Sequence, residues 1–401
     1  MPDKKSFSQL SIIKQIDACV SCGLCLTVCP TYKNLQNESE SPRGRLSIIK
    51  GLVAEEISIS KSSYKYLDHC LMCGACEAVC PAKVEYTAIL GQAKLWLHER
   101  GYKSFYDRFF GWLVYRNYRI FFLGKIIALY RMLGIQKVLP LNSVKLYADD
   151  VKTVKGKEYY PVASGVNAKG DVYLFRGCVA SLFDRDTIKS SIAMLNIAGY
   201  NVIFPDNQTC CGSLAIHNGD VIRATKLKQN NLEVFTRDIP LIVTSTGCIN
   251  SVSKFSDKVS SLYDILEFLA IHLTLDHESN LKIKGNVLSH IPCSQRLRTE
   301  SLIASRKLLN AFCDNYLELD NSGSCCGSAG TYMYRNKQLA DKVVSPLIRQ
   351  VDTAETPNFI VTQNIGCRMQ LMNHTRRRVT EVIHPVTLIY REKFNKHEKF
   401  D

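Results

Sequence analysis

Two cysteine motifs in the N-terminal quarter of the chain have the spacing of a redox metal site. The first runs from Cys19 to Pro30 and the second from Cys70 to Pro81, and both read C-x-x-C-x-x-C-x-x-x-C-P. This run holds [4Fe–4S] cubanes, with the fourth cysteine of each motif ligating the cluster of the other. The spacing therefore predicts crosswise ligation, with one cluster on Cys19, Cys22, Cys25 and Cys80 and the other on Cys70, Cys73, Cys76 and Cys29.

Zinc is the alternative metal for these cysteines, because Cys-x-x-Cys pairs also suit a tetrahedral zinc site. Zinc, however, requires neither a third cysteine three residues further on nor the terminal Cys-Pro. We also expect the fourth cysteine of each motif to begin a helix that points toward the other cluster. Two adjacent cubanes form a path for electrons without a nucleophile or base, so we expect no catalytic residue here.

A basic turn, Pro42-Arg43-Gly44-Arg45, lies between the two motifs. It can be an exposed turn with no further role. Alternatively, arginine donors close to a cluster would raise its reduction potential, because a reduced cluster gains negative charge. The residues alone leave both interpretations open.

The C-terminal half carries a second, duplicated set of cysteines. In both copies 31 residues separate a cysteine from a Cys-Cys-Gly triplet, and these features are offset by 115 residues. A Gly-Cys pair completes each copy, at an offset of 119 residues. This repetition predicts gene duplication and a pseudo-two-fold pair of domains. The four cysteines of a copy are candidate ligands of a further iron–sulfur cluster, or a thiolate site for redox chemistry: Cys178, Cys210, Cys211 and Cys248, then Cys293, Cys325, Cys326 and Cys367.

The elements that would position these cysteines are short apolar runs, typical of buried parallel strands, alternating with helical patterns. The cysteines fall where the runs end, the usual place for a site on an open α/β sheet. Cys313 belongs to neither set and lies in a helical pattern, so we expect a plain buried thiol. The predicted strands cover 171–175, 201–205 and 240–246 in the first copy, and 286–291, 316–319 and 358–363 in the second.

The segment 94–145 contains ten Lys and Arg against two acidic residues and is rich in aromatic residues. It can form helices that cover the cysteine module. It can also be an amphipathic basic and aromatic element that lies on a membrane surface.

Composition narrows the cellular setting. The chain has seventeen cysteines among 401 residues, whereas a secreted disulfide framework would have an even number. The N-terminus also lacks the apolar core of a signal peptide. We therefore expect a reducing cytoplasm, with thiolates on metal rather than disulfides. The chain contains no run of about 18 uncharged apolar residues, so we expect no transmembrane helix. The formal charge of +14 favours a polyanionic neighbour, such as anionic lipid or an acidic protein, and no nucleic-acid-binding module is recognisable.

The motifs taken together resemble a known family. The paired CCG triplets are similar to the cysteine-rich domain of heterodisulfide-reductase-type and quinone-linked dehydrogenase subunits. More specifically, CPTY, PRGR, CCGSAGTY and VTQNIGC resemble the iron–sulfur subunits of bacterial glycolate oxidase, in an order that extends from about Asp17 to the C-terminus; these motifs lie at 29–32, 42–45, 325–332 and 361–367.

The resemblance implies an α+β fold. An N-terminal α-helical bacterial-ferredoxin-type domain for two [4Fe–4S] clusters would precede two duplicated α/β cysteine-rich (CCG) domains. The expected division is a ferredoxin-type domain over 1–92, a helical basic segment and linker over 93–170, a first CCG domain over 171–280 and a second over 281–401.

The resemblance also implies a role. The chain would take electrons from an FAD-containing subunit that oxidises glycolate and pass them to a respiratory quinone, on the inner face of the cytoplasmic membrane. No Rossmann glycine fingerprint follows any predicted strand, so the hydride chemistry is expected in a partner. The equivalent subunit of a D-lactate or glycerol-3-phosphate dehydrogenase remains an alternative.

The sequence departs from the family at two positions. The fullest CCG motif ends in C-x-x-C, whereas the last positions here are Ser251 and Gln370. This departure leaves four-cysteine sites open and argues against a five-thiolate non-cubane centre. It also favours electron transfer over the rival activity, disulfide reduction by a heterodisulfide-reductase-like catalytic subunit. A structural scaffold stapled by metal would not explain the cubane spacing.

Overall fold

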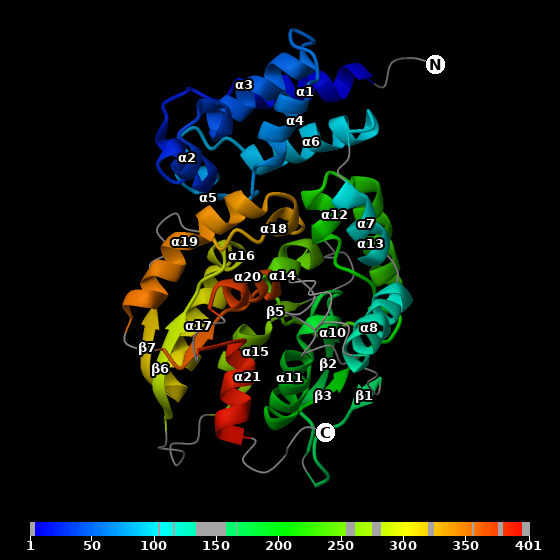
Figure 1. The fold of residues 1–401 in the computed structure, drawn as a ribbon. Helices are drawn as coiled ribbons and strands as arrows, with labels where there is room; N and C mark the ends of the chain where they lie inside the picture. The colour runs from blue at the N-terminus through cyan, green and yellow to red at the C-terminus, as the bar shows by residue number, and fades with distance from the viewer. Residues whose placement is uncertain are drawn as a thin grey trace. The chain divides into compact units, whose positions relative to one another are not determined.

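The computed structural model describes residues 5–102, 105–114, 117–133, 158–165, 167–253, 261–274, 282–319, 325–354, 357–375 and 380–394. The chain divides into two compact units, and each unit is assembled from separate stretches of sequence. Unit 1 consists of residues 1–110, 214–223 and 320–350, and unit 2 of residues 111–213, 224–319 and 351–401. Figure 1 gives the labels of the elements.

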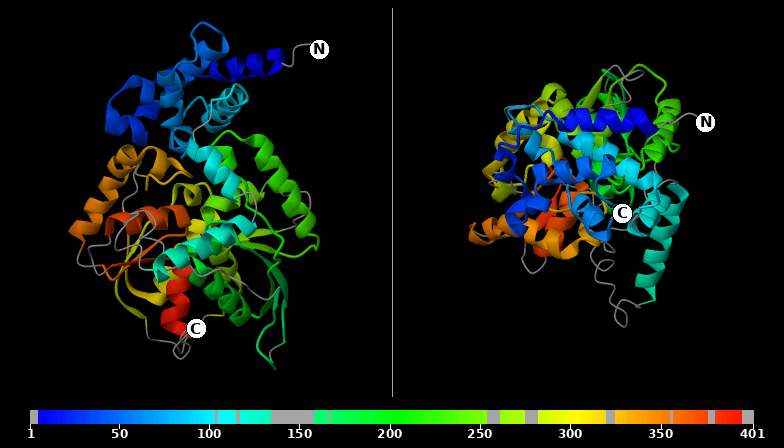
Figure 2. Two further views of the ribbon diagram at one scale, coloured as in Figure 1. Left: turned by 45° about the vertical axis from the view of Figure 1, so that its right-hand side comes forward. Right: turned by 90° about the horizontal axis from the view of Figure 1, so that it is seen from above.

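In unit 1 the described elements are helices. The apolar faces of the helices before residue 100 meet in one core, with Ile12, Ile49, Leu67, Ile89 and Leu90 almost completely buried. Figure 2 shows the same helices from two further directions. In chain order the elements are α1 (Lys5–Ile16), η1 (Leu24–Leu26), α2 (Pro30–Leu35), η2 (Glu38–Glu40), α3 (Pro42–Val53), α4 (Lys61–Asp68), α5 (Ala75–Ala78), α6 (Tyr86–Glu99), most of α7 (Phe105–Val114), most of α12 (Ser213–His217), α18 (Tyr332–Arg335) and most of α19 (Lys337–Thr353).

Helix α3 begins within the predicted basic turn, for a clear local reason. Ser41 is its N-cap and accepts a hydrogen bond from the amide of Gly44 at 2.9 Å, while Pro42 occupies the first helical turn, where its missing N–H costs nothing. A Cβ at position 44 would lie 2.0 Å from the carbonyl oxygen of Glu38, so only glycine fits. The PRGR motif is thus the start of a helix rather than a free turn.

The first sheet of unit 2 has the strand order β1-β3-β2-β4-β5. Strands β3, β2, β4 and β5 are parallel, and β1 pairs with β3 in the antiparallel direction. The inner strand β4 is buried along its whole length, as a parallel strand covered on both faces should be. The bounds are β1 (Tyr159–Tyr160), β2 (Gly170–Phe175), β3 (Tyr200–Ile203), β4 (Leu241–Val243) and β5 (Leu262–Asp264).

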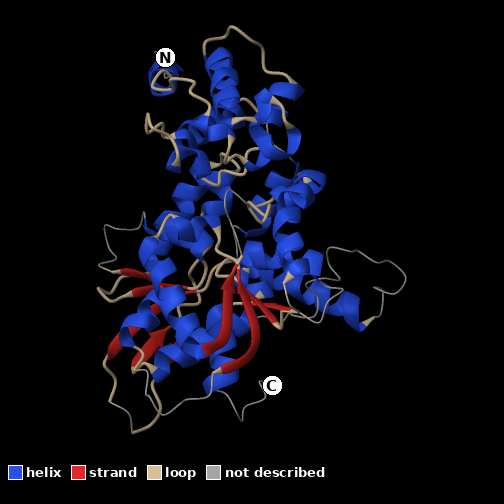
Figure 3. Ribbon diagram, turned by 90° about the vertical axis from the view of Figure 1, so that its left-hand side faces the viewer, coloured by secondary structure: helices blue, strands red, loops and turns tan. Residues whose placement is uncertain are grey.

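The second sheet repeats this arrangement with four parallel strands in the order β7-β6-β8-β9. The two sheets share one apolar core, to which Val172 and Ile188 contribute from the first repeat and Val287 and Val361 from the second. The α+β organisation and the duplication are therefore confirmed, and Figure 3 distinguishes the strands from the helices. The bounds are β6 (Ile283–Ser289), β7 (Cys313–Glu318), β8 (Phe359–Val361) and β9 (Glu381–Ile383).

Helices connect the strands of unit 2 in both repeats. Asp264, the last residue of β5, caps α15 through a hydrogen bond from the amide of Leu266 at 2.9 Å, and Glu267 completes a capping box. The helices are α8 (Asn117–Met132), α10 (Ala180–Phe183), α11 (Arg185–Ile197), most of α13 (Val221–Val234), α14 (Thr246–Val252), α15 (Ile265–His272), α16 (Cys293–Arg296), α17 (Thr299–Phe312), α20 (Ile365–Thr375) and α21 (Pro385–Ile389), which continues into a π-helical turn, η6 (Tyr390–Phe394).

Two local predictions were wrong. Cys313 is buried as expected, but it opens strand β7 directly after α17 instead of lying inside the helix. Cys29 is the N-cap of a helix, α2, whereas Cys80 is followed by a turn and no helix begins there. The reason is that Lys83 takes a left-handed conformation, with φ of 50°, and donates its amide to the carbonyl oxygen of Cys80.

The basic and aromatic segment forms α7 and α8 within its described part. None of the helices that the structure describes is both long and apolar enough to cross a bilayer. Arg116, a basic residue of this segment, lies outside the described residues.

Candidate iron–sulfur centres

The two N-terminal motifs fold into matching loops. In each loop, the residue before the second cysteine and the glycine after it have positive φ angles: 53° at Ser21 and 85° at Gly23, then 50° at Met72 and 72° at Gly74. Left-handed residues next to ordinary ones turn successive amide N–H groups toward a common centre, which makes a concave site for anions. Because Ser21 and Met72 are not glycines, this conformation costs energy that the rest of the fold must offset.

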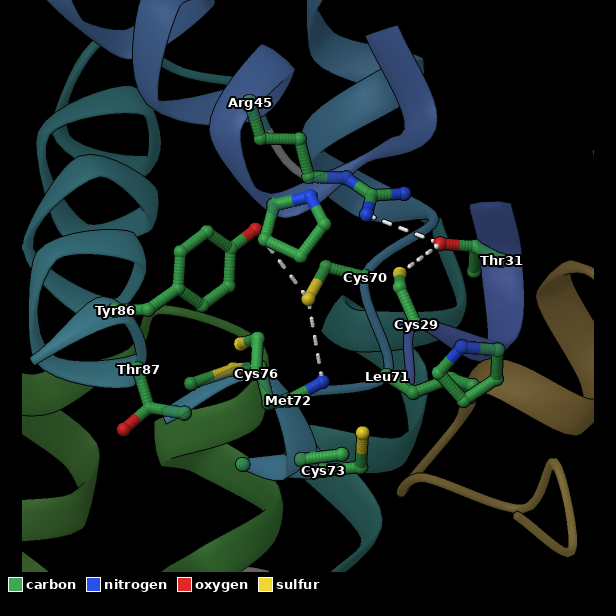
Figure 4. A pocket seen from close by; sticks show the side chains of 14 residues that line it. Cys29, Thr31, Arg45, Cys70, Leu71, Met72, Cys73, Cys76, Tyr86 and Thr87 are labelled. Atoms are coloured by element: carbon green, nitrogen blue, oxygen red, sulfur yellow. Dashed lines mark hydrogen bonds between the residues drawn. The ribbon is translucent and has the colours of Figure 1, made fainter. Parts of the chain in front are cut away.

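A cavity lies in the second loop, within unit 1 (Figure 4). Its lining includes the four cysteines predicted for the second cluster, Cys29, Cys70, Cys73 and Cys76. Cys29 comes from the first motif, so the chain brings together the residues that the crosswise spacing requires. The assignment of these cysteines as ligands stays a prediction.

The chemistry of this cavity fits a cationic cluster core. Burial strongly raises the pKa of the Cys76 thiol, and the neighbouring Cys70, Cys73 and Cys29 raise it further. A Cys76 thiolate is therefore unfavourable here unless a positive charge compensates it. Metal binding would supply the compensating positive charge and displace the protons.

Hydrogen-bond donors surround the sulfur of Cys70. The amide of Met72 lies 3.4 Å from it and the hydroxyl of Tyr86 lies 3.7 Å from it (Figure 4). Tyr332, which follows the second Cys-Cys-Gly triplet, interacts electrostatically with Cys70, and its buried hydroxyl has no hydrogen-bond partner among the described atoms. An inorganic cluster held by Cys70 would provide an acceptor atom for the Tyr332 hydroxyl.

No three His, Cys, Asp or Glu side chains form a group suited to a single metal ion in the part of the chain that the structure describes. Thiolates of a cubane instead surround a volume, since each one binds a different iron. The cavity in the second loop has this arrangement.

The first motif is more exposed. Cys22 is exposed, whereas Cys19, Cys25 and Cys80 are partly buried. Burial raises the pKa of the Cys25 thiol, the Arg43 amide opposes that shift, and Cys19 is close enough to interact with it. Cys80 accepts a hydrogen bond from the amide of Val84 at 3.5 Å.

The two arginines of the PRGR motif have different surroundings. Residues two apart on a helix point in nearly opposite directions, since each residue turns the chain by about 100°. Arg43 is partly exposed, pairs with Glu38 at 2.7 Å and donates to the carbonyl oxygen of Ser21 at 3.0 Å. Arg45 is fully buried and lines the cavity. The interpretation as a mere exposed turn is therefore wrong for Arg45.

In the first repeat the structure brings all four predicted cysteines together, in unit 2. They follow β2, β3 and β4, which are neighbours in the sheet, so the site lies at the carboxyl ends of parallel strands, as predicted. The sulfur atoms of Cys178 and Cys210 are 3.3 Å apart, and Cys211 is hydrogen-bonded to both Cys210 and Cys248.

One sulfur of this group is the favoured thiolate. Cys211 accepts hydrogen bonds from Cys210, Cys248 and Ser213, which lower the pKa of its thiol well below the usual value despite its burial. The hydrogen bonds with Cys178 and Cys211 raise the pKa of Cys210, and the hydrogen bond with Cys211 raises that of Cys248. A group that accepts three donors is prepared to hold a negative charge and hence to bind a metal centre.

The cysteines of the second repeat are divided between the two units, with two cysteines in each. Cys325 and Cys326 are buried in unit 1, where the amide of Gly327 donates to the sulfur of Cys325 at 3.4 Å. Gly327 has a φ of 76°, and a Cβ there would lie 2.7 Å from a carbonyl oxygen of α19, so glycine is required. Cys293 and Cys367 lie in unit 2, at the starts of α16 and α20.

The two positions that depart from the family motif are also defined. Ser251 is buried, and its hydroxyl is 2.7 Å from that of Ser213, which contacts Cys211. Gln370 is buried on α20 and lies 3.5 Å from the ring of His374. A serine hydroxyl thus lies beside the first thiol group, where the fullest motif has a cysteine.

Several polar side chains near the second loop were not predicted as site residues. Thr31 belongs to CPTY and Arg45 to PRGR, so the motifs carried a signal for both. Glu40 and His69 had none, because their roles depend on contacts between distant segments of the chain.

Comparison with known proteins agrees with this architecture. The family model described as a 4Fe-4S dicluster domain matches residues 15–84, and the model described as a cysteine-rich domain matches twice, at 172–253 and 287–372. These matches contain all sixteen candidate ligand cysteines.

Similar curated proteins point to the same group. The probable glycolate oxidase iron-sulfur subunit of Bacillus subtilis is 27% identical over 389 residues, which covers 88% of this chain and 87% of the relative. The glycolate oxidase iron-sulfur subunit of Escherichia coli is 26% identical, over 90% of this chain and 91% of the relative. Lactate utilization protein A of Oceanobacillus iheyensis is 25% identical over 53% of this chain and 92% of its own length.

The resemblance inferred from the motifs is thus confirmed over most of the chain. The chain belongs to the iron–sulfur proteins in which a 4Fe-4S dicluster domain precedes two cysteine-rich domains, a group that includes the glycolate oxidase iron–sulfur subunits.

Proposed function

We propose that the chain is the electron-transfer subunit of a glycolate oxidase complex. It receives electrons from an FAD-containing subunit that oxidises glycolate to glyoxylate, and it passes them to a respiratory quinone. The observation that carries this proposal is the buried cavity in the second loop, which both cysteine motifs line. The names and coverage of the B. subtilis and E. coli relatives support the choice of complex.

In this proposal the N-terminal motifs hold two [4Fe–4S] clusters. Cys19, Cys22, Cys25 and Cys80 hold one, and Cys70, Cys73, Cys76 and Cys29 hold the other. Each cluster, when bound, supplies one-electron redox chemistry. The protein's own contribution is to bury the second set of thiolates and to direct amides and hydroxyls at their sulfurs.

The cysteine-rich repeats are proposed to hold one or two further clusters. The first set, Cys178, Cys210, Cys211 and Cys248, is supported by the hydrogen-bonded contacts between its thiols. For the second set, Cys293, Cys325, Cys326 and Cys367, the support is the repeated sequence spacing. We also propose that the domains end at residues 92, 170 and 280, as the family resemblance implies.

Membrane association is proposed through α8. Phe122, Ile126 and Leu129 lie on one face of this helix and are 62%, 49% and 49% exposed, with Lys125 exposed beside them. Apolar side chains next to cations suit the interface of an anionic bilayer, and the net charge of +14 favours the same surface. The location would be the inner face of the cytoplasmic membrane.

A lactate-oxidising complex is the second candidate. It is supported by the relative from O. iheyensis, whose name refers to lactate and which matches about half of this chain. The relay would be the same, and only the substrate of the flavoprotein partner would differ.

The test is the content of iron and acid-labile sulfide in anaerobically purified protein, with EPR spectra of the reduced sample. About eight irons per chain would support the two N-terminal clusters, and twelve to sixteen would support further clusters in the repeats. Zinc in place of iron would refute the relay.

A further inference from the structure

Arg45 is the one guanidinium among the residues that line the second-loop cavity. Its side chain is only 1% exposed. Burial of a permanent cation is expensive unless every donor is satisfied. The partners that Arg45 has acquired therefore indicate what this charge does.

Every nitrogen of the Arg45 guanidinium has a partner. Nε donates to the carbonyl oxygen of Tyr66 at 2.7 Å, and Nη2 donates to Oε2 of Glu40 at 2.6 Å. The other carboxylate oxygen of Glu40 is 2.7 Å from Nδ1 of His69. The remaining nitrogen, Nη1, donates to the hydroxyl oxygen of Thr31 at 3.0 Å (Figure 4). One arm of the guanidinium is thus held by a carboxylate, and the other is directed at Thr31.

Thr31 connects this cation to a predicted cluster ligand. Its hydroxyl oxygen is 3.3 Å from the sulfur of Cys29 and 2.8 Å from the carbonyl oxygen of Glu40. A ligand thiolate has no proton and can only accept a hydrogen bond. The Thr31 hydroxyl has one proton, which it donates to the carbonyl oxygen of Glu40. When Cys29 is a thiolate, this proton is shared with the sulfur in a bifurcated hydrogen bond, while Arg45 donates to the hydroxyl oxygen.

We infer that Arg45, acting through Thr31, raises the reduction potential of the cluster held by Cys29, Cys70, Cys73 and Cys76. Reduction adds negative charge to a cluster, and hydrogen bonds to its ligand sulfurs stabilise that charge. Arg45 is therefore a positioning residue. This inference rests on the proposed ligand set.

The first motif lacks an equivalent device. Arg43 donates its Nη1 to the backbone oxygen of Ser21, and its charge is paired with Glu38 at the surface. The guanidinium of Arg43 thus contacts the backbone of the loop and not a cysteine sulfur. The cluster that contains Cys29 should therefore have the higher potential of the two, so electrons at equilibrium would favour it.

The test is an EPR-monitored redox titration of the full chain with its clusters in place. Thr31→Val removes the hydroxyl and keeps the shape of the side chain. We expect the higher of the two midpoint potentials to fall by about 59 mV, which is a tenfold change in a one-electron equilibrium. The lower potential should stay unchanged and serves as an internal reference.

Three further variants complete the test. Thr31→Ser retains the hydroxyl and should restore the wild-type potential, which a role in packing alone would not predict. Arg43→Lys changes the exposed arginine and should leave the higher potential unchanged. Arg45→Lys keeps the charge and loses the forked geometry, and it should lower the higher potential in the same direction as Thr31→Val.

The outcomes separate this inference from the proposed function. If Thr31→Val binds both clusters and neither potential changes, or only the lower one does, the role of Arg45 is refuted while the relay stands. If the wild-type chain binds no iron, the proposed function fails and the inference fails with it.

Discussion

Cys29 connects the two cysteine motifs. It lies in the first motif, yet it lines the cavity formed by the second, and it is the N-cap of α2. Its sulfur is within 3.3 Å of the Thr31 hydroxyl. One residue therefore links the two loops, the helix start and the buried network of Arg45.

The change Cys29→Ser should therefore damage the cluster held mainly by Cys70, Cys73 and Cys76. We expect the loss of one EPR signal and of up to about four irons per chain, since serine is a poor replacement for a thiolate ligand. Cys22→Ser is the matched control and should affect the other signal. Loss of the same signal in both variants would contradict crosswise ligation.

At the residue scale, the sequence predicted the ligand candidates better than their surroundings. Cysteine spacing is a local property, and it pointed to the four cysteines among the residues that line the cavity. The environment of Arg45 is not local, because Thr31, Glu40 and Tyr66 reach it from other segments. Periodicity could place Arg43 and Arg45 on opposite faces of a helix, but only the fold decides which face is buried.

At the scale of elements, α15 depends on a buried carboxyl group at its start. Burial and the nearby Glu267 together raise the pKa of Asp264 from 3.8 to about 7, against the opposing effects of the helix amides and Arg298. The folded chain therefore holds a proton that the unfolded chain releases at lower pH. The stability linked to this proton is present below about pH 4 and is lost as the pH rises to about 7.

Asp264→Asn should make the free energy of unfolding less dependent on pH between about 4 and 7. Asparagine keeps the capping oxygen and does not ionise, so the variant avoids a loss of up to about 4 kcal/mol. Urea unfolding at pH 5 and pH 7.5 measures the difference. Asp238→Asn, at an exposed position, is the control, and an equal pH dependence in wild type and Asp264→Asn would disprove the linkage.

Helix α8 carries a separate prediction. Changing Arg119 and Lys125 to glutamine should weaken binding to anionic vesicles by about 2 kcal/mol, or roughly thirtyfold, and reduce its salt dependence. Co-sedimentation with phosphatidylserine-containing liposomes is the measurement. Lys226→Gln with Lys284→Gln removes the same charge from other exposed sites. Unchanged sedimentation of the α8 variant would leave α8 as a covering helix only.

The elements that the sequence predicted well are the short apolar strands, because a buried parallel strand needs little more than β-branched and apolar residues. The failures were the short strands β1, β5 and β9, which were not predicted, and some element ends. Cys313 continues an apolar pattern that helix and strand share, so the switch from α17 to β7 was not visible. At Cys80, the left-handed Lys83 prevented the helix that the motif predicted.

At the scale of the whole molecule, the duplicated repeats and the helical module should act only within a complex. The chain with its clusters should not reduce a quinone analogue when glycolate is added alone. Addition of the FAD-containing partner subunit should start the reaction, because that subunit would supply the hydride chemistry. Anaerobic quinone reduction is the assay, and glycolate-dependent activity of the isolated chain would contradict the assignment as a relay.

Unit 1 draws on residues as distant as 320–350, which pack with the N-terminal helices. Arg335 pairs with Asp68, and Lys94 donates to the carbonyl oxygen of His217 at 3.0 Å. During synthesis, a ribosome that has released only the two cysteine motifs has not yet made these contacts. The N-terminal module can therefore reach its final packing only when most of the chain has emerged, which places the completion of this unit late in biosynthesis.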